Sequence, residues 1–388
     1  MSTRSITADV NPQILRWARE SVGLAVSQVA RRLPKISHWE SGEASPTVRQ
    51  LETLSDIYKR PLAAFFLPAP PTEPPPPTDF RVLASEEQRP LTKKVLLAIR
   101  RARRTQRLFA ELSGELSVGR QTRLPRARVS DDPEARSTEV RRMLGIQLND
   151  QFSWQDGYEA FRAWRAATEV VGVLVLQFPM PVKEARGFSL SSGPVPTIVV
   201  NSSDAILARI FTLFHELGHL VVNTGGVCIP DQTIPNEPSR QTEQFCNHFS
   251  GALLVPLSAL QAQTELHVLP QSPDEIDDVF ENASKRFKAS RQVVLRRLLT
   301  ADYATAQQFR RVMDRWKRAE AAVSVRRQRG GAKPAAQALS QLGTGFVSLV
   351  LEAHGRGIIT ASDVSDYLSV KVKHLPQVQQ LLAVRARG

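Results

Sequence analysis

Two histidines and a glutamate stand in the spacing His-Glu-x-x-His within a strongly apolar stretch of the chain. These residues are His215, Glu216 and His219. Residues four apart share one face of a helix, so both imidazoles can point at a single ion, with Glu216 beside them. Two imidazoles and one carboxylate suit Zn²⁺ and leave a fourth position for water. The spacing therefore predicts a zinc site in which Glu216 is the general base of peptide hydrolysis.

The residues around this motif predict a buried helix. Positions from Ile210 to Val221 are apolar on nearly every side of a helical projection. Buried histidines and glutamates without partners cost free energy, so a metal ion is their simplest partner. The alternative, in which the two histidines sit at the surface of an ordinary helix, fits this apolar context poorly.

A third ligand is expected on a second helix a few tens of residues later. The segment Gln241–Pro256 has apolar residues at helical spacing and ends at a proline. Glu243 is the preferred ligand; Asn247 follows one turn later on the same face, where its amide can orient a ligating imidazole. Cys246 and His248 compete as ligands but point away from the Glu243 face. An ordinary solvated carboxylate at Glu243 is the remaining alternative.

The segment Gly172–Pro256 resembles the ImmA/IrrE family of zinc peptidases. The likeness is carried by the strings GVLVLQFP, RGFSL, PTIVVN, FTLFHELGHL and EQFCNHFSGALLVP. It departs from the family pattern E-x-x-A-N-x-F-A at two small residues, which are cysteine and serine here. The resemblance implies that His215, His219 and Glu243 bind the metal and that Glu216 is the general base. It also implies a substrate class, namely DNA-bound repressor proteins.

Length and composition indicate a soluble chain with several domains. Its 388 residues can form two or three domain cores. No apolar run approaches the roughly 18 residues of a membrane span, and the first residues lack the apolar segment of a secretion signal. Two cysteines, Cys228 and Cys246, fit a reducing compartment. We therefore expect a cytoplasmic protein that makes no membrane contact.

The net charge of +13 is unevenly distributed along the chain. Residues 129–280, which contain the metal motif, are acidic overall, whereas residues 85–128 and 281–388 are strongly basic. The first basic flank contains a predicted amphipathic helix at Glu86–Leu116. Basic flanks can contact DNA, an acidic partner or the chain's own acidic middle, and charge alone does not decide among these.

The first 68 residues predict a small helical unit that resembles the helix-turn-helix domain of the xenobiotic-response-element (XRE) repressor family. The string ISHWESGEASPT at Ile36–Thr47 carries much of the likeness. About four residues are missing from the turn before the recognition helix, and Pro34 disfavours helix at the residue before it. The unit either binds DNA or is a vestigial bundle that packs on the peptidase or a partner. The candidates for DNA contact are Arg31, Arg32, Lys35, Ser37 and His38.

The expected fold is α+β and mostly helical, with a zincin-like core of a small sheet and metal-binding helices. Strands are predicted at Val171–Phe178 and Thr197–Asn201. An edge strand of this sheet is a candidate track for the backbone of a substrate. The expected order is a helix-turn-helix-like domain, a proline-rich linker, the peptidase domain, a helix-turn-helix-like module with a basic helix, and a helical extension: residues 1–68, 69–85, 86–265, 266–335 and 336–388.

Two functions fit these patterns. The first is an intracellular zinc endopeptidase, gluzincin-like and in some states latent, that cleaves a repressor or a toxin–antitoxin partner in stress or mobile-element regulation. The second is a non-proteolytic transcriptional regulator or antitoxin that uses the metal fold as a sensing scaffold. The shortened helix-turn-helix favours the peptidase. We expect one Zn²⁺, a protein substrate, DNA as a further partner, and a homodimer as an assembly to test.

Overall fold

The computed structural model describes residues 6–74, 91–118, 122–223, 227–228, 237–267, 269–270, 272–322 and 333–385. Contacts divide the chain into two compact units: residues 1–76 with 85–101, and residues 77–84 with 102–388. Within the described residues each unit buries its own apolar core. The fold is α+β and mostly helical, as predicted, with one small sheet in the larger unit.

The N-terminal unit is a bundle of short helices. They are α1 (Pro12–Glu20), α2 (Val26–Ala30), α3 (Ile36–Ser41), α4 (Val48–Tyr58) and the 3-10 helix η1 (Leu62–Phe66). Asn11 starts α1 by accepting a hydrogen bond from the Gln13 amide, and Pro12 occupies the first helical position, where no amide hydrogen is needed. Every helix contributes to one core, whose largest members include Leu15, Val29, Trp39, Tyr58 and Phe65.

A buried ion pair fixes α3 against α1. Arg19 Nε donates to Glu40 Oε1 at 2.8 Å, and Arg19 Nη2 donates to Glu40 Oε2 at 2.9 Å. The hydrogen bonds that Arg19 donates to Glu40 outweigh burial and raise the pKa of Arg19. The residues proposed for DNA contact lie in the turn between α2 and α3 and on α3, and all of them are exposed. His38 Nδ1 lies 2.6 Å from Glu43 Oε2. DNA contact by this exposed segment stays a prediction.

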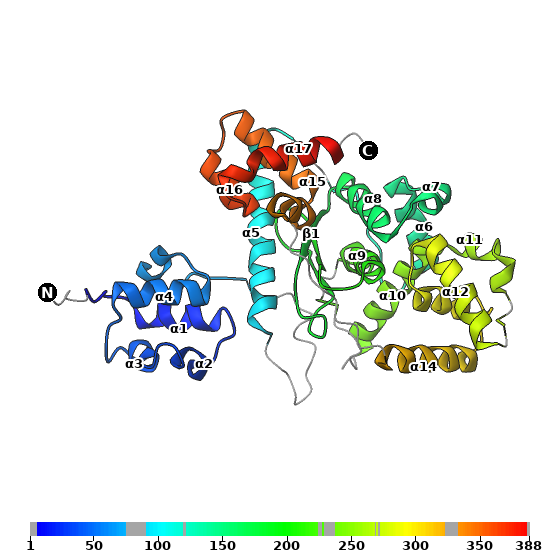
Figure 1. Ribbon diagram of the computed structural model, residues 1–388, viewed down its shortest axis with the longest axis horizontal. Coiled ribbons are helices and arrows are strands. Elements are labelled where there is room, and N and C mark those ends of the chain that lie inside the picture. The colour runs from blue at the N-terminus through cyan, green and yellow to red at the C-terminus, as the bar shows by residue number, and fades with distance from the viewer. Residues whose placement is uncertain are drawn as a thin grey trace. The chain divides into compact units, whose positions relative to one another are not determined.

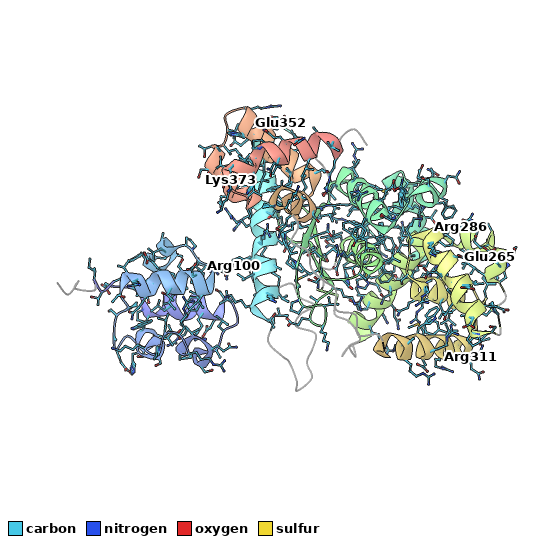
Figure 2. The ribbon with its side chains drawn as sticks, viewed as in Figure 1. Arg100, Glu265, Arg286, Arg311, Glu352 and Lys373 are labelled. Carbon is cyan, nitrogen blue, oxygen red and sulfur yellow. The ribbon has the colours of Figure 1, made fainter. Side chains whose placement is uncertain are left out.

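The long helix α5 (Lys93–Glu115) begins in the N-terminal unit. Arg100, labelled in Figure 2, donates to the backbone oxygens of Tyr58 and Ser21 at 3.2 and 3.3 Å. Burial lowers the pKa of Arg100 to about 10. Basic side chains at this end of α5 therefore hold the bundle together. Residues 86–90 of the predicted helix Glu86–Leu116 lie outside the described part.

The larger unit contains the remaining elements. They are α6 (Pro133–Leu144), α7 (Leu148–Ser153), α8 (Gly157–Val170), β1 (Leu174–Phe178), β2 (Gly187–Leu190), β3 (Thr197–Asn201), α9 (Ile206–Val221), β4 (Val227–Cys228), α10 (Glu237–Leu254), α11 (Leu257–Gln261), η3 (Thr264–Leu266), α12 (Pro273–Phe287), α13 (Arg291–Thr300), α14 (Ala306–Ala322), α15 (Pro334–Gly355), α16 (Ala361–Leu368), η4 (Val372–His374) and α17 (Leu375–Arg385). None of the described helices combines the length and apolar character needed to cross a membrane.

The sheet has the strand order β1-β3-β2-β4. β1 and β3 are parallel, with Leu174 opposite Thr197, whereas β2 runs antiparallel to β3 and to β4. The predicted strand Thr197–Asn201 is confirmed as β3, and the predicted strand Val171–Phe178 as β1, although β1 begins only at Leu174 after a turn; both strands are buried along their whole length. Helix α9 packs on β2 and β3, with α10 next to it (Figure 1).

The C-terminal helices cover the outer edge of β1. Arg165 on α8 donates from Nε to Glu169 at 2.9 Å and from Nη1 to the backbone oxygen of Ser340 on α15 at 2.7 Å. Its Nη2 donates to the backbone oxygen of Val175 in β1. Gly343 kinks α15 at φ 84°, and a Cβ there would come within 2.5 Å of both members of the pair. This edge is therefore closed to an incoming peptide strand.

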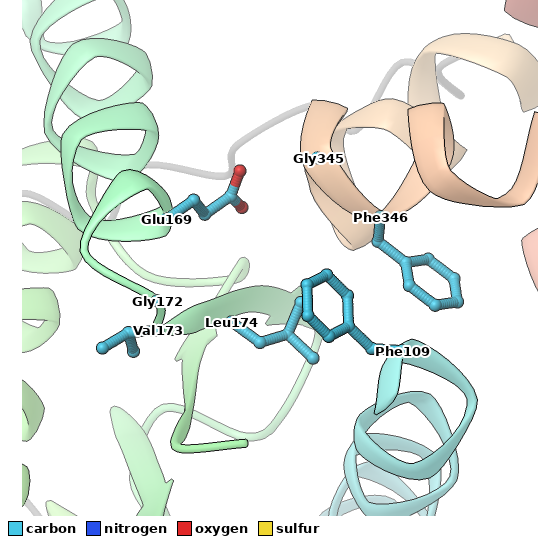
Figure 3. A pocket seen from close by; sticks show the side chains of 7 residues that line it. All are labelled: Phe109, Glu169, Gly172, Val173, Leu174, Gly345 and Phe346. Carbon is cyan, nitrogen blue, oxygen red and sulfur yellow. The ribbon is translucent and has the colours of Figure 1, made fainter. Parts of the chain in front are cut away.

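An apolar seam joins α5, α15 and the start of β1. Figure 3 shows its side chains around a small cavity that also borders Glu169 and Gly172. The rings of Phe109 and Phe346 stack there, with centroids 6.5 Å apart. Because aromatic and aliphatic groups dominate the lining, we interpret the seam as packing between the helices and the sheet.

The predicted helix-turn-helix-like module after the metal helices is part of the main core. Its expected core residues are all buried in the same cluster as α9 and α10: Phe287, Val293, Val294 and Leu298. Helix α14 carries exposed basic side chains, among them Arg311 (Figure 2). Its buried Trp316 donates from Nε1 to Asp277 at 2.6 Å. Arg315 beside it donates to the same Asp277 oxygen at 2.6 Å, so part of the basic charge of α14 serves its packing.

Glu134 joins three helices of the larger unit. It lies in the first turn of α6. Its carboxylate accepts hydrogen bonds from Arg297 of α13, with Nη1–Oε1 at 2.5 Å and Nη2–Oε2 at 3.0 Å. His248 of α10 lies 2.7 Å from the same Oε1. Arg297 also donates from Nε to the backbone oxygen of Val255 and is almost completely buried. The carboxylate therefore neutralises a buried cation at the junction of α6, α10 and α13.

Replacing Glu134 with glutamine should destabilise the larger unit by about 3 kcal/mol, because the buried Arg297 loses its counter-ion. Urea unfolding of the full chain measures this. Glu139→Gln is the matched control on the same helix, since Glu139 pairs with Arg136 at the surface and should cost less than about 1 kcal/mol. Equal losses in the two variants would contradict the role assigned to Glu134.

The contact between Glu134 and Arg297 should also make the free energy of unfolding fall at acidic pH. Burial alone would raise the pKa of Glu134, but hydrogen bonds from His248 and Arg297 outweigh it and lower the pKa. A depressed pKa means that this contribution is complete above the ordinary pKa of glutamate and disappears as pH falls through the folded-state value. Unfolding midpoints of the wild type and Glu134→Gln should therefore converge at low pH.

Candidate functional site

The two imidazoles of α9 and the Glu243 carboxylate of α10 lie in close contact with one another. His215 Nε2 lies 3.1 Å from Glu243 Oε2, and His219 Nε2 lies 3.1 Å from Glu243 Oε1. The two Nε2 atoms are 3.2 Å apart. The structure thus brings together the three ligands predicted from the sequence.

The spacing of these donor groups fits the ligands of one zinc ion. With Zn–N and Zn–O bonds of about 2.0–2.1 Å, neighbouring ligands of a tetrahedral ion are separated by about 3.3 Å. The observed separations are within a few tenths of an ångström of that value. Glu243 is 21 % exposed, so the cluster has a side toward solvent where a fourth ligand can enter. The donor set and its spacing fit Zn²⁺.

The metal motif lies on a helix that is buried almost throughout its second half. His215, Glu216 and His219 are each at most 1 % exposed. Within the described residues, His215 Nδ1 and both carboxylate oxygens of Glu216 lack a hydrogen-bond partner of ordinary geometry. Unpartnered polar atoms at this depth are costly, which points to a ligand or ion that completes the site.

The pKa values of the two glutamates of the site are shifted in opposite directions. Burial raises the pKa of Glu216 to about 7, against the opposing effect of His219, His215 and the nearby Ser189 hydroxyl. For Glu243, hydrogen bonds from both histidines overcome burial and lower the pKa strongly. A carboxylate that stays charged suits a ligand, and one poised near neutral pH suits a general base.

Two glycines allow the elements of the site to approach closely. A Cβ on Gly218, between the two histidines, would lie 3.2 Å from Cys246 Sγ and 3.3 Å from the Cys246 Cα. A Cβ on Gly187 of β2 would lie 2.5 Å from Thr212 Cγ2 and 2.8 Å from the backbone oxygen of Val199. Gly218 therefore sets the α9–α10 spacing, and Gly187 sets the spacing of α9 from the sheet.

The residues expected around the ligands are arranged differently from the prediction. Asn247 is exposed, and no hydrogen bond among the described residues joins it to either histidine. Cys246 is buried instead, and its side chain hydrogen bonds with His219. His248 turns toward Glu134 and away from the cluster. Cys246 thus occupies the supporting position proposed for Asn247.

The sequence held a signal for this difference. Cys246, Phe249 and Leu253 recur at helical spacing and are all buried, so they mark the face of α10 that packs on α9. Asn247 lies one turn after Glu243, outside that stripe, and is exposed. Ser189 and Gly187 were missed because β2 is too short for its alternation to stand out from the surrounding loop.

Residues 168–299 match the model of the peptidase family Peptidase_M78, described as the IrrE N-terminal-like domain. The match runs from the end of α8 to α13 and contains the sheet and both helices of the metal cluster. It supports a peptidase-type enzyme and agrees with the resemblance to the ImmA/IrrE family. The N-terminal unit lies outside the matched segment. No curated protein matches the chain.

Gly187→Ala should destabilise the larger unit by about 1–3 kcal/mol and weaken metal binding, because the new methyl group forces β2 away from α9. Urea unfolding and zinc titration measure the two effects. Gly114→Ala is the control: a Cβ at Gly114 of α5 meets no atom within 4 Å, and alanine is the better helix former. Tight zinc binding in Gly187→Ala would refute the assigned spacing role.

Proposed function

We propose that this chain is a zinc-dependent endopeptidase that cleaves a regulatory protein. The observation that supports it most directly is the cluster of His215, His219 and Glu243, with the buried carboxylate of Glu216 beside it. The match of the surrounding segment to a peptidase family agrees with this chemistry.

Each residue of the site has a distinct part in the proposed hydrolysis. When bound, zinc supplies a Lewis acid that polarises a carbonyl and lowers the pKa of water. Glu216 accepts a proton from the attacking water and passes it to the leaving amine, a task suited to a pKa near 7. Cys246 positions the ring of His219 through its hydrogen bond. The apolar residues of α9 exclude bulk water from this exchange.

A peptide substrate would lie along the edge of the sheet opposite β1, where the short strand β4 pairs with β2. The edge of β1 is closed by Arg165 and α15, whereas β2 packs directly on α9 and carries Ser189 near Glu216. Adding a strand to a sheet satisfies the backbone of an extended peptide without a fixed sequence. Specificity would then come from contacts outside the cluster.

The proposed substrate is a repressor or a toxin–antitoxin partner in stress or mobile-element regulation, in a cytoplasmic setting. The exposed segment with Arg31, Arg32 and Lys35 supports a contact with DNA that would bring the peptidase to a DNA-bound protein. A homodimer is the proposed assembly. The competing function, a regulator that uses the metal fold only as a scaffold, is separated from the peptidase by the glutamate variants below.

Glu216→Gln should keep zinc and lose cleavage by about 10²–10⁴-fold, because the amide accepts no proton. A pull-down with this variant, followed by mass spectrometry, should retain the intact substrate that the wild type cuts. Glu139→Gln serves as a surface control with full activity. If Glu216→Gln preserves the cellular phenotype while loss of residues 1–68 abolishes it, the scaffold function is correct.

Glu243→Gln should bind zinc much more weakly, because the site loses its anionic ligand and keeps both imidazoles. Elemental analysis of purified protein should give one zinc per wild-type chain and a clear deficit in the variant. Zinc should also raise the unfolding free energy of the wild type by about 2.7 kcal/mol at a hundredfold excess over Kd, with no comparable gain in Glu243→Gln. A wild type that contains no divalent metal would exclude the proposal.

A further inference from the structure

Arg141 on α6 is a buried cation with few partners. It is 9 % exposed, and its Nη1 donates to the backbone oxygen of Leu253 at 2.8 Å. Its guanidinium carbon lies 5.2 Å from the ring centre of Trp164. Nη2 is buried and has no hydrogen-bond acceptor among the described residues. A guanidinium with an unused buried donor is an incomplete arrangement.

No carboxylate in the described part of the chain forms an ion pair with Arg141. Burial lowers its pKa to about 10, and Asp150 opposes this only from a distance. The Asp150 carboxylate is engaged elsewhere, because it accepts a hydrogen bond from the Gln147 amide at 2.8 Å. This contrasts with Arg297, which has the full carboxylate of Glu134. Among the described residues, the charge of Arg141 therefore has no counter-ion.

Arg141 lines an open cavity of about 320 Å³ between α6, the start of α7 and the end of α10. Most of the other lining groups are polar and short: Ser137, Thr138, Gln147, Asn149 and Ser258. Hydroxyls and amides of this kind can donate hydrogen bonds to an anion without adding negative charge. The volume falls in the range of cavities that hold small molecules.

The cavity is separate from the metal cluster. Ala252 lines it, whereas Glu243 lies on the same helix about 14 Å away along the axis. The metal cluster consists of two imidazoles and a carboxylate, whereas the cavity is lined by the Arg141 guanidinium and neutral hydrogen-bond donors. The two places therefore suit different ligands.

We propose that this cavity binds a small molecule bearing an oxyanion group, a carboxylate or a phosphate, through the guanidinium of Arg141. Arginine presents several N–H donors in a plane and pairs with oxyanions more strongly than with neutral acceptors. The ligand completes the hydrogen bonds of a buried cation that the protein leaves unpaired. This site does not depend on the proposed peptidase activity.

Calorimetric titration of the zinc-loaded full chain with inorganic phosphate and, separately, with acetate tests the proposal at constant ionic strength set with chloride. Saturable binding of either anion is expected, and the anion that binds identifies the oxyanion. Arg141→Lys should weaken binding by about tenfold or more, because a single ammonium cannot reproduce the paired hydrogen bonds. Arg142→Lys, at the exposed neighbouring position, should leave binding unchanged.

A second variant keeps the test informative if Arg141→Lys does not fold. Ser258 is exposed at the cavity, so Ser258→Asp adds a negative charge there without disturbing the core and should weaken anion binding, while Ser258→Asn should not. Zinc content should be the same in all of these variants. The proposal is overturned if neither anion binds the wild type, or if binding survives unchanged in Arg141→Lys and Ser258→Asp.

Discussion

The close contact between α9 and α10 is the constraint on which the site depends. A zinc tetrahedron tolerates errors of only a few tenths of an ångström in the positions of its donor atoms. Here two donors come from α9 and the third from α10, so the separation and rotation of these helices decide whether a metal can bind. Gly218 permits the approach, and Cys246 fills the space that the missing side chain leaves. The supporting hydrogen bond to His219 comes from that same contact.

Helices α6, α8 and α13 of the larger unit hold α9 and α10 in place by packing on their other faces. α10 also packs on α6, and the Glu134–Arg297 pair connects both to α13. Trp164 of α8 meets the ring of Phe214 edge-on, with centroids 4.9 Å apart, one residue before the first histidine. Buried groups that are close-packed in this way have little freedom to shift. In each of these contacts one partner lies within the segment matched by the peptidase family, and the other precedes that segment on α6 or α8.

Outside the matched segment, polar groups are used differently in the two units. Basic residues at the start of α5 bind backbone oxygens of the N-terminal bundle, as Arg100 does. In the larger unit Arg165 and Glu169 close the edge of β1, and they pack against the kink of α15 at Gly343, where a side chain would clash with them. Basic composition therefore indicates partners poorly, because several of these charges serve the fold itself. Arg141 stands apart, since it is buried and forms no ion pair with a carboxylate of the described residues.

The sequence by itself determined the chemistry of the site: the spacing of His215 and His219, the buried helix around them and the helical stretch that carries Glu243. It also indicated the long strands β1 and β3. Tertiary structure alone decided that Cys246 supports His219, that β2 lies over Glu216, and that Arg141 lines a cavity. The physical reason is that periodicity orders residues within one element. Contacts between elements depend on how the whole core rotates and spaces them.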